Sequence, residues 1–179
     1  MKNKNSKHGF TLIETIVAVA ILSAAVAGPM VLSIKNIGTA SVSQDQLVAF
    51  YLGQEVVEYV RNVRDTNIIN ASSDWLNGLS ACKGVSGCYI DIKNNIAPIV
   101  CDPDPKGCPK IKFNENLKNY NYQPVVAGLN KETSFIRTVK IDNSIRTDGD
   151  EAKISIALKW TSKYGEKTMI LQDNIFNWR

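Results

Sequence analysis

Hydrophobic and polar positions divide the chain into unlike parts. Residues 1–9 are polar and basic, whereas from Phe10 to Ile34 the only ionisable side chain is Glu14. The 20 residues from Thr15 to Ile34 are uncharged and mostly apolar. As a helix they would be about 30 Å long, the thickness of the hydrocarbon core of a bilayer. This pattern predicts a membrane-spanning helix over residues 10–34, with the basic segment in the cytoplasm and the residues after Lys35 outside.

A second helical pattern begins beyond Gly38. Its apolar residues recur at steps of three and four, which predicts one stripe on one face of a helix. We expect one helix from about Phe10 to Asp65, bent at Gly28-Pro29 because proline removes a backbone hydrogen bond, and weakened near Gly38. Packing against a sheet is favoured over partner binding for this amphipathic continuation at 35–65. The stripe consists of Val48, Leu52, Val56, Tyr59 or Val60, and Val63.

The last third of the chain alternates between apolar and polar residues. This period of two predicts antiparallel strands whose apolar face lies on the helix, within a β-rich head at 66–179. A third run covers residues 167–172, and Phe176 and Trp178 are expected to pin the last segment to the head. The fold class is therefore α+β. The inward-facing residues are Phe135, Arg137, Val139 and Ile141 in one run and Ile154, Ile156, Leu158 and Trp160 in the next.

Four cysteines enclose two short loops, Cys82 to Cys88 and Cys101 to Cys108. An even number of cysteines on the outer face of a membrane predicts two disulfides, for which the sequence permits three connectivities. Local pairing, Cys82–Cys88 with Cys101–Cys108, is the first choice because short closures form readily. The nested pairing, Cys88–Cys101 with Cys82–Cys108, would follow if residues 89–92 and 97–100 form a hairpin. Zinc is disfavoured because the gaps of five and six residues exceed the usual spacing.

Charge and composition disfavour several classes of function. Removing Lys2, Lys4 and Lys7 leaves 18 basic residues (21 minus 3) against 17 acidic ones, so the body has no basic surplus that would suggest nucleic-acid binding. The single histidine, His8, lies in the basic segment, which excludes histidine-based catalysis and His-ligated zinc from the body. Acidic residues at 102–104 and 148–151 lack the spacing of a calcium loop and sit in turns without a cleft. We therefore expect no enzyme activity, cofactor or metal.

The front of the chain carries a specific ordered motif. Gly9-Phe10-Thr11-Leu12-Ile13-Glu14 follows a short lysine-rich leader and precedes 14 uncharged residues from Thr15 to Gly28. This string resembles the prepilin leader of type IV pilins and type II secretion pseudopilins. The resemblance covers residues 1–35, and beyond them it rests on general architecture.

The resemblance implies a processing and assembly scheme. A prepilin peptidase/methyltransferase would cut after Gly9 and methylate the new amine of Phe10, and residues 10–34 would remain as an anchor and filament-core helix. Glu14 would pair with the terminal amine of a neighbouring pilin or pseudopilin subunit. The precursor would be single-pass in the lipid of the cytoplasmic membrane, with a pilin-like head outside, and would act as a structural subunit. The disulfide-rich head favours a minor subunit or a tip adhesin.

An alternative scheme uses the small residues Ala25-Val26-Ala27, after which a signal peptidase could cut before Gly28. That cleavage would release a secreted binding or adhesion domain, or a secreted enzyme using carboxylate or Ser-Lys chemistry. Glu14 argues against this scheme, because a carboxylate in an apolar segment is costly and usually functional. The alternative interpretation of Glu14 is that it has no such function and lies near enough to the membrane surface for water to solvate its carboxylate.

Overall fold

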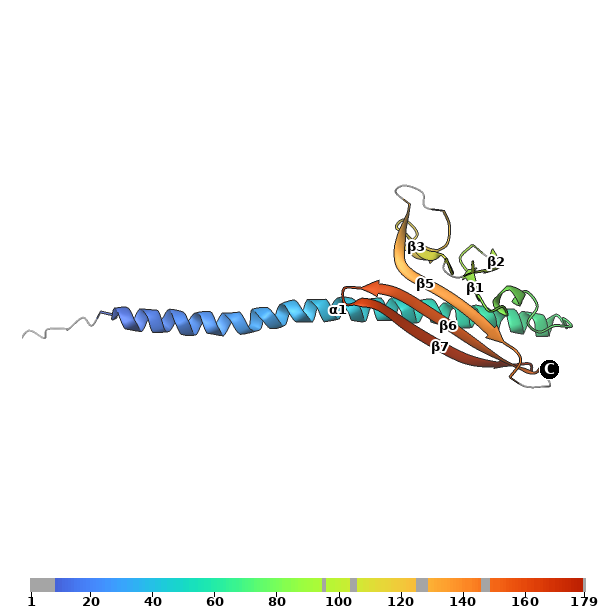
Figure 1. Ribbon diagram of the computed structural model, residues 1–179, viewed down its shortest axis with the longest axis horizontal. Coiled ribbons are helices and arrows are strands. Elements are labelled where there is room, and N and C mark those ends of the chain that lie inside the picture. Colours follow the sequence, from blue (N-terminus) through green and yellow to red (C-terminus); the bar gives the residue numbers. More distant parts are fainter. Residues whose placement is uncertain (1–8, 95, 104–105, 125–128, 146–148, 179) are drawn as a thin grey trace, which may run out of the picture. The chain divides into compact units, whose positions relative to one another are not determined.

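The computed structural model describes residues 9–94, 96–103, 106–124, 129–145 and 149–178. One helix, α1 (Leu12–Ile69), is followed by a 3₁₀ turn at Ser80–Cys82 and seven strands (Figure 1).

The chain divides into two compact units, Met1–Ser43 and Gln44–Arg179, so that α1 contributes to both. We call the second unit the head and its part of α1, residues 44–69, the head helix. The α+β class is confirmed. The strands are β1 (Cys88–Asp91), β2 (Ile96–Val100), β3 (Lys110–Asn114), β4 (Asn119–Asn121), β5 (Asn130–Asp142), β6 (Glu151–Ser162) and β7 (Gly165–Phe176).

Helix α1 is longer and more regular than the sequence predicts. It ends at Ile69, four residues beyond Asp65, and continues without a break through Gly28-Pro29 and Gly38. Proline has no N–H to donate to the carbonyl four residues earlier. One turn later, the Ser33 hydroxyl donates to the Pro29 carbonyl at 2.9 Å. A bend at Gly28-Pro29 stays a prediction, whereas the weakening near Gly38 does not interrupt the helix.

The head helix buries the predicted stripe against the sheet. Leu52, Val56 and Val60 are buried, and Ala49 and Val57 widen the stripe. Gly53 permits close approach of β7, because a Cβ atom there would lie 2.9 Å from Leu171 Cδ1. The shared core is the head's main source of hydrophobic stabilisation.

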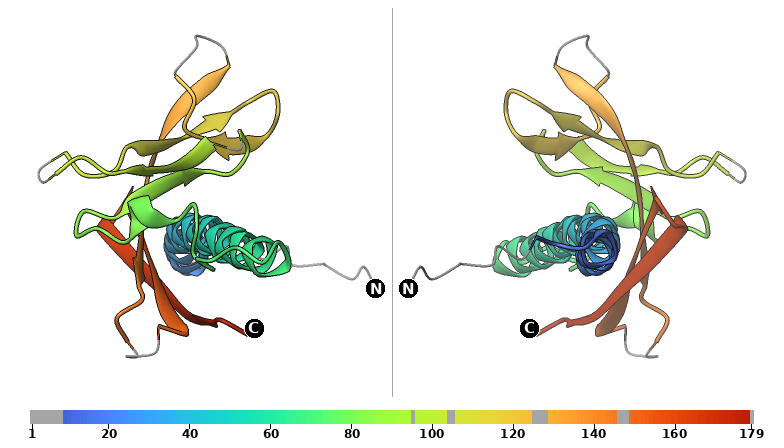
Figure 2. Two further views of the ribbon diagram at one scale, coloured as in Figure 1. Left: turned by 90° about the vertical axis from the view of Figure 1, so that its right-hand side faces the viewer. Right: turned by 90° about the vertical axis from the view of Figure 1, so that its left-hand side faces the viewer.

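Strand β5 is the centre of an antiparallel sheet. Along one edge it pairs first with β3, where Ile136 faces Lys110, and then with β1, where Val139 faces Cys88. Its other edge pairs with β6, which pairs in turn with β7. Outer strands β2 and β4 extend β1 and β3 respectively. Figure 2 shows this sheet lying along the head helix.

The predicted meander corresponds to β5, β6 and β7. Burial alternates along β5 and β6 as expected, with the predicted apolar residues inward. The expectation for the last segment holds only in part: Phe176 and Trp178 are about half exposed and Ile175 is the residue that is buried, but Trp178 hydrogen-bonds to Asp65 on the head helix. Further polar contacts tie the end. The backbone N–H of Asn177 donates to the Asp150 carbonyl at 2.9 Å, and its side-chain amide donates to Asp150 Oδ1.

Arg137 is the one charged residue on the inward face of β5, and its guanidinium is buried. Nη1 donates to the Leu52 carbonyl at 2.8 Å and lies 3.3 Å from Glu55 Oε2. Nη2 donates to the Ile90 carbonyl at 2.7 Å. Arg137 therefore ties β5 to both the head helix and β1, which the alternation alone did not reveal.

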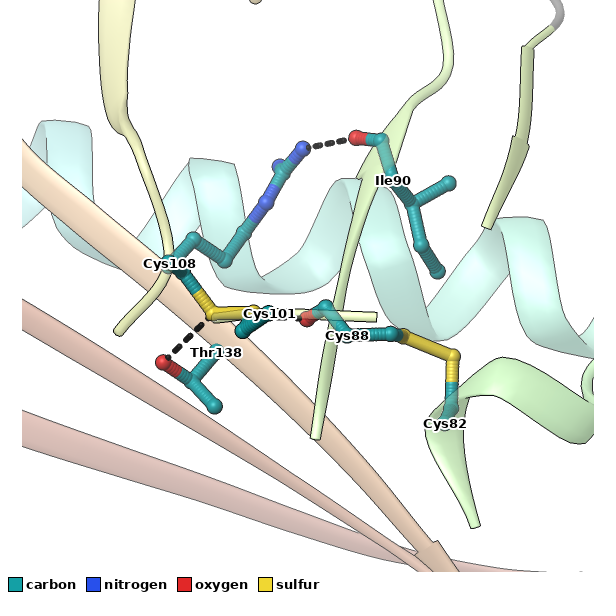
Figure 3. The surroundings of a disulfide bond; sticks show 7 residues. Cys82, Cys88, Ile90, Cys101, Cys108 and Thr138 are labelled. Carbon is teal, nitrogen blue, oxygen red and sulfur yellow. Dashed lines mark hydrogen bonds between the residues drawn. A yellow bond between two sulfur atoms is a disulfide. The ribbon is translucent and has the colours of Figure 1, made fainter. Parts of the chain in front are cut away.

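Disulfides join Cys82 to Cys88 and Cys101 to Cys108, which is the local pairing (Figure 3). The β1–β2 hairpin also forms, although the sequence argument linked such a hairpin to the nested pairing. Register explains the difference. Cys88 faces Val100 and the Cys101 N–H donates to the Gly87 carbonyl. Successive residues of a strand point to opposite faces, so Cys88 and Cys101 point away from each other.

Candidate processing and assembly site

The predicted cleavage point lies just before α1. Gly9 and Phe10 have no regular secondary structure, and α1 begins two residues later at Leu12. Phe10 is 83% exposed, and a Cβ atom on Gly9 would have no neighbour within 4 Å. The peptide bond between the two residues is therefore accessible and outside the helical hydrogen bonds, as a peptidase substrate requires. Residues 1–8 of the expected leader lie outside the described part of the chain.

Thr11 caps the start of α1. The backbone N–H of Glu14 donates to Thr11 Oγ1 at 3.3 Å and to the Thr11 carbonyl at 3.1 Å. This geometry makes Thr11 the N-cap and Glu14 the third helical residue, which is the spacing of a capping box, but only the bond to the Thr11 side chain forms. The capping role of Thr11 was not predicted from the sequence, although the Thr-x-x-Glu spacing is its ordinary signal.

Glu14 also carries the only carboxylate of the apolar segment. Its position in the first turn of α1 favours the negative charge, because the helix dipole is positive there. From the described residues, this carboxylate receives no hydrogen bond and no ion pair, and its exposed surroundings leave it open to an external cation. The structure thus places Phe10 and Glu14 at the same end of α1, with the carboxylate accessible.

The segment Leu12–Met30 is 19 residues long and apolar enough to cross a membrane. None of this segment is buried, and its large side chains, such as Leu22 at 67% exposure, cover all sides of the helix. Such a helix needs lipid or other helices around it. The segment is thus suited to act as a single-pass membrane anchor.

Hydroxyl groups in the N-terminal part of α1 are satisfied within the helix. Thr15 Oγ1 donates to the Leu12 carbonyl and Ser23 Oγ to the Val19 carbonyl, both at 2.8 Å. These hydroxyls need no water or protein partner. In a hydrocarbon environment polar groups must be hydrogen-bonded within the protein, and these hydroxyls meet that requirement.

The other candidate residues lie elsewhere. The four cysteines belong to the head, where they fasten the 3₁₀ turn and the β2–β3 connection. Two acidic residues weighed as calcium ligands, Asp104 and Asp148, lie outside the described residues. Among the residues that are described, no three His, Cys, Asp or Glu side chains gather as a metal site would require.

Comparison with known families identifies one match. Residues 4–28 match the prokaryotic N-terminal methylation motif, which is the signature of type IV pilins and pseudopilins. The match spans Gly9, Phe10 and Glu14 and most of the apolar segment. Searches of curated proteins and of solved structures gave no match.

Proposed function

Because residues 4–28 carry the prokaryotic N-terminal methylation motif, we propose that this chain is a subunit of a type IV pilus-like or type II secretion-like filament. Prepilin peptidase cuts it after Gly9, and the new terminus at Phe10 is N-methylated. The motif carries the proposal, and the accessible Gly9–Phe10 bond supports it. The chain's role is structural.

The apolar segment 10–34 anchors the subunit before assembly and joins the filament core afterwards. The leader 1–9 stays in the cytoplasm, because its lysines hold that end inside, and the β-rich part of the head, residues 66–179, stands outside. Small side chains along the segment let neighbouring helices approach closely. Disulfides fit this location, because they persist in oxidising compartments. The irregular, disulfide-bonded head favours a minor subunit.

Glu14 sets the register between subunits. Cleavage creates a cationic amine on Phe10, and methylation keeps its charge. In a bundle of helices an unpaired amine and an unpaired carboxylate are each costly, so the amine of one subunit docks on Glu14 of another. The pairing fixes an axial stagger even where it adds little net stability.

Glu14 also stands three residues after the N-cap Thr11, so an experiment must separate the helix cap from pairing. Glu14→Gln keeps a residue that can complete the capping box but removes the charge. Thr11→Ala keeps the charge but removes the cap at Oγ1. Both variants should be processed and inserted normally, as should Glu14→Ala.

Filament incorporation is measured in cells of the native host by shearing filaments from the surface and quantifying the subunit in them. Pairing predicts that Glu14→Gln and Glu14→Ala lose at least tenfold in incorporation while Thr11→Ala stays near the wild type. Equal incorporation of Glu14→Gln and the wild type would contradict the pairing. Loss with Thr11→Ala alone would show that incorporation depends on the helix cap and not on the charge of Glu14.

A further inference from the structure

A cleft of about 390 Å³ lies in the head between the head helix and the β3–β4 hairpin. The helix contributes one face through four residues at steps of three and four, and the opposite wall comes from β4 and the turn before it. This volume lies within the range of small-molecule sites, which combine apolar walls with a few polar groups. The lining residues are Val48, Tyr51, Leu52, Glu55, Lys93, Lys118, Asn119 and Tyr120.

Two tyrosines supply the aromatic part of the lining. Tyr51 is 67% exposed, so its ring is available to a ligand and little of the fold depends on it. Tyr120 is held in place by Phe113, with the ring centroids 5.1 Å apart. Burial, together with the nearby charge of Asp45, raises the pKa of Tyr120, which keeps its hydroxyl protonated and able to donate. The cleft therefore offers flat apolar surface next to hydroxyl groups.

The polar part of the lining combines acceptors with donors. Glu55 lies 3.7 Å from Lys93 Nζ and 3.3 Å from Arg137 Nη1. Because two cations already offset its charge, Glu55 offers a ligand oxygen lone pairs more than a free negative charge. Asn119 adds an amide, and Lys118 an ammonium with three donors.

Lys118 has an unusual backbone that positions it at the cleft. Its φ of 51° lies in the left-handed region, which non-glycine residues seldom adopt. The preceding turn is fixed by Asn114 Oδ1, which accepts the N–H groups of Asn116 at 3.0 Å and Leu117 at 2.8 Å. The edge of the cleft is thus preformed, which lowers the cost of ordering it on binding.

We propose that this cleft binds a pyranose unit of a saccharide. A pyranose has flat C–H faces that pack on aromatic rings, and a rim of hydroxyls that both donate and accept hydrogen bonds. Those needs match the tyrosine surface and the Glu55, Asn119 and Lys118 groups. A cationic ligand would find the carboxylate already paired. Ligand binding goes beyond the proposed structural role and does not depend on it.

The test uses the full chain in micelles of a detergent without a sugar headgroup. Saturation-transfer-difference NMR is run with glucose, galactose, mannose, N-acetylglucosamine and N-acetylgalactosamine, and with short unglycosylated peptides in parallel. Tyr51→Ala removes the exposed ring. Lys118→Gly removes the ammonium while suiting the left-handed backbone. Tyr164→Ala is the matched control, because Tyr164 is also an exposed tyrosine but is absent from the lining.

We expect at least one sugar to receive saturation from the wild type and from Tyr164→Ala. Tyr51→Ala and Lys118→Gly should each raise the Kd for that sugar at least tenfold while the unfolding midpoint of the head stays unchanged. Saturation of peptides and of no sugar would overturn the proposal. So would the absence of any saturation, or sugar binding that survives both substitutions.

Discussion

The two halves of α1 share one helical backbone but meet different surroundings. In Leu12–Met30 the apolar residues occupy every side of the helix and all are exposed. In the head helix they form one stripe that β-strands cover. Helical periodicity alone therefore does not indicate what a helix packs on. The width of the apolar surface does, because a single stripe packs on one neighbour and an apolar surface on all sides needs apolar surroundings on all sides. The first half needs lipid or neighbouring subunits, and the second finds its partner within the chain.

Charged groups show the same contrast. Arg137 in the head is buried and bonded to Leu52, Glu55 and Ile90. The Glu14 carboxylate has no partner among the described residues. An unpaired charge in an apolar setting is costly. The head satisfies its cation internally, whereas the proposed pairing would supply the partner of Glu14 from another subunit.

Removing the buried cation should have the largest effect on the head. Arg137→Met leaves two carbonyls and Glu55 without their donor, so we expect a loss of about 3–5 kcal/mol in the free energy of unfolding. Denaturant titration of the micelle-bound chain, followed by tryptophan fluorescence, measures it. Lys93→Met, at the exposed end of the same cluster, should cost less than about 1 kcal/mol. Equal losses in the two variants would contradict the central role of Arg137.

Matched leucine truncations separate the two halves of α1 directly. Leu52 is 4% exposed and Leu22 is 67% exposed. Leu52→Ala should lower the free energy of unfolding of the head by about 2–3 kcal/mol, because it leaves a cavity under the sheet. Leu22→Ala should leave head unfolding unchanged, since its side chain is largely exposed and truncating it leaves no cavity. A loss of similar size from Leu22→Ala would show that the stability of the head also depends on side chains in the first half of α1, which would contradict the comparison.

The smallest effect concerns the end of the head helix. The hydrogen bond from Arg64 Nε to Asp65 Oδ1, 2.7 Å long, lowers the pKa of Asp65, and a hydrogen bond from Trp178 lowers it further. Since the folded pKa lies below the unfolded one, the stabilisation is present above the unfolded pKa and is lost as pH falls through the folded value. Arg64→Gln should raise the pKa of Asp65 more than Trp178→Phe does.

Carboxyl ¹³C chemical shifts followed during an acid titration give these values. Asp142 serves as an internal control, because Ser144 is the main cause of its lowered pKa and neither substitution touches that contact. An unchanged titration of Asp65 in Arg64→Gln would contradict the assignment of the shift to that hydrogen bond.

Local pattern was enough to predict α1 and the strands β5, β6 and β7, but not β3, β4 or the contacts between distant residues. The stripe of the head helix and the alternation in β5 and β6 follow from residue spacing, and continuing that alternation along β7 would have placed Ile175 inward. The partners of Arg137 lie 85 and 47 residues away in sequence, at Leu52 and Ile90, so no local rule could find them. The direction in which each cysteine points depends on the register of the β1–β2 hairpin, which spacing does not supply.

The candidate functional residues likewise include some that the sequence reveals and some that only the structure reveals. An ordered string around Gly9 and Glu14 made the processing residues visible in the sequence, and the Thr11 cap was equally visible from its spacing. The cleft was not, because it joins head-helix residues to Lys93 and to a β-turn more than 60 residues further on (Tyr51 to Lys118).

The terminus of the mature protein tests the central claim most directly. Membrane-extracted protein from the native host is digested, and its first peptide is identified by mass spectrometry. The account predicts a peptide that begins with N-methylated Phe10 and retains the apolar segment. A first peptide beginning at Gly28, in protein recovered free of the membrane, would contradict it.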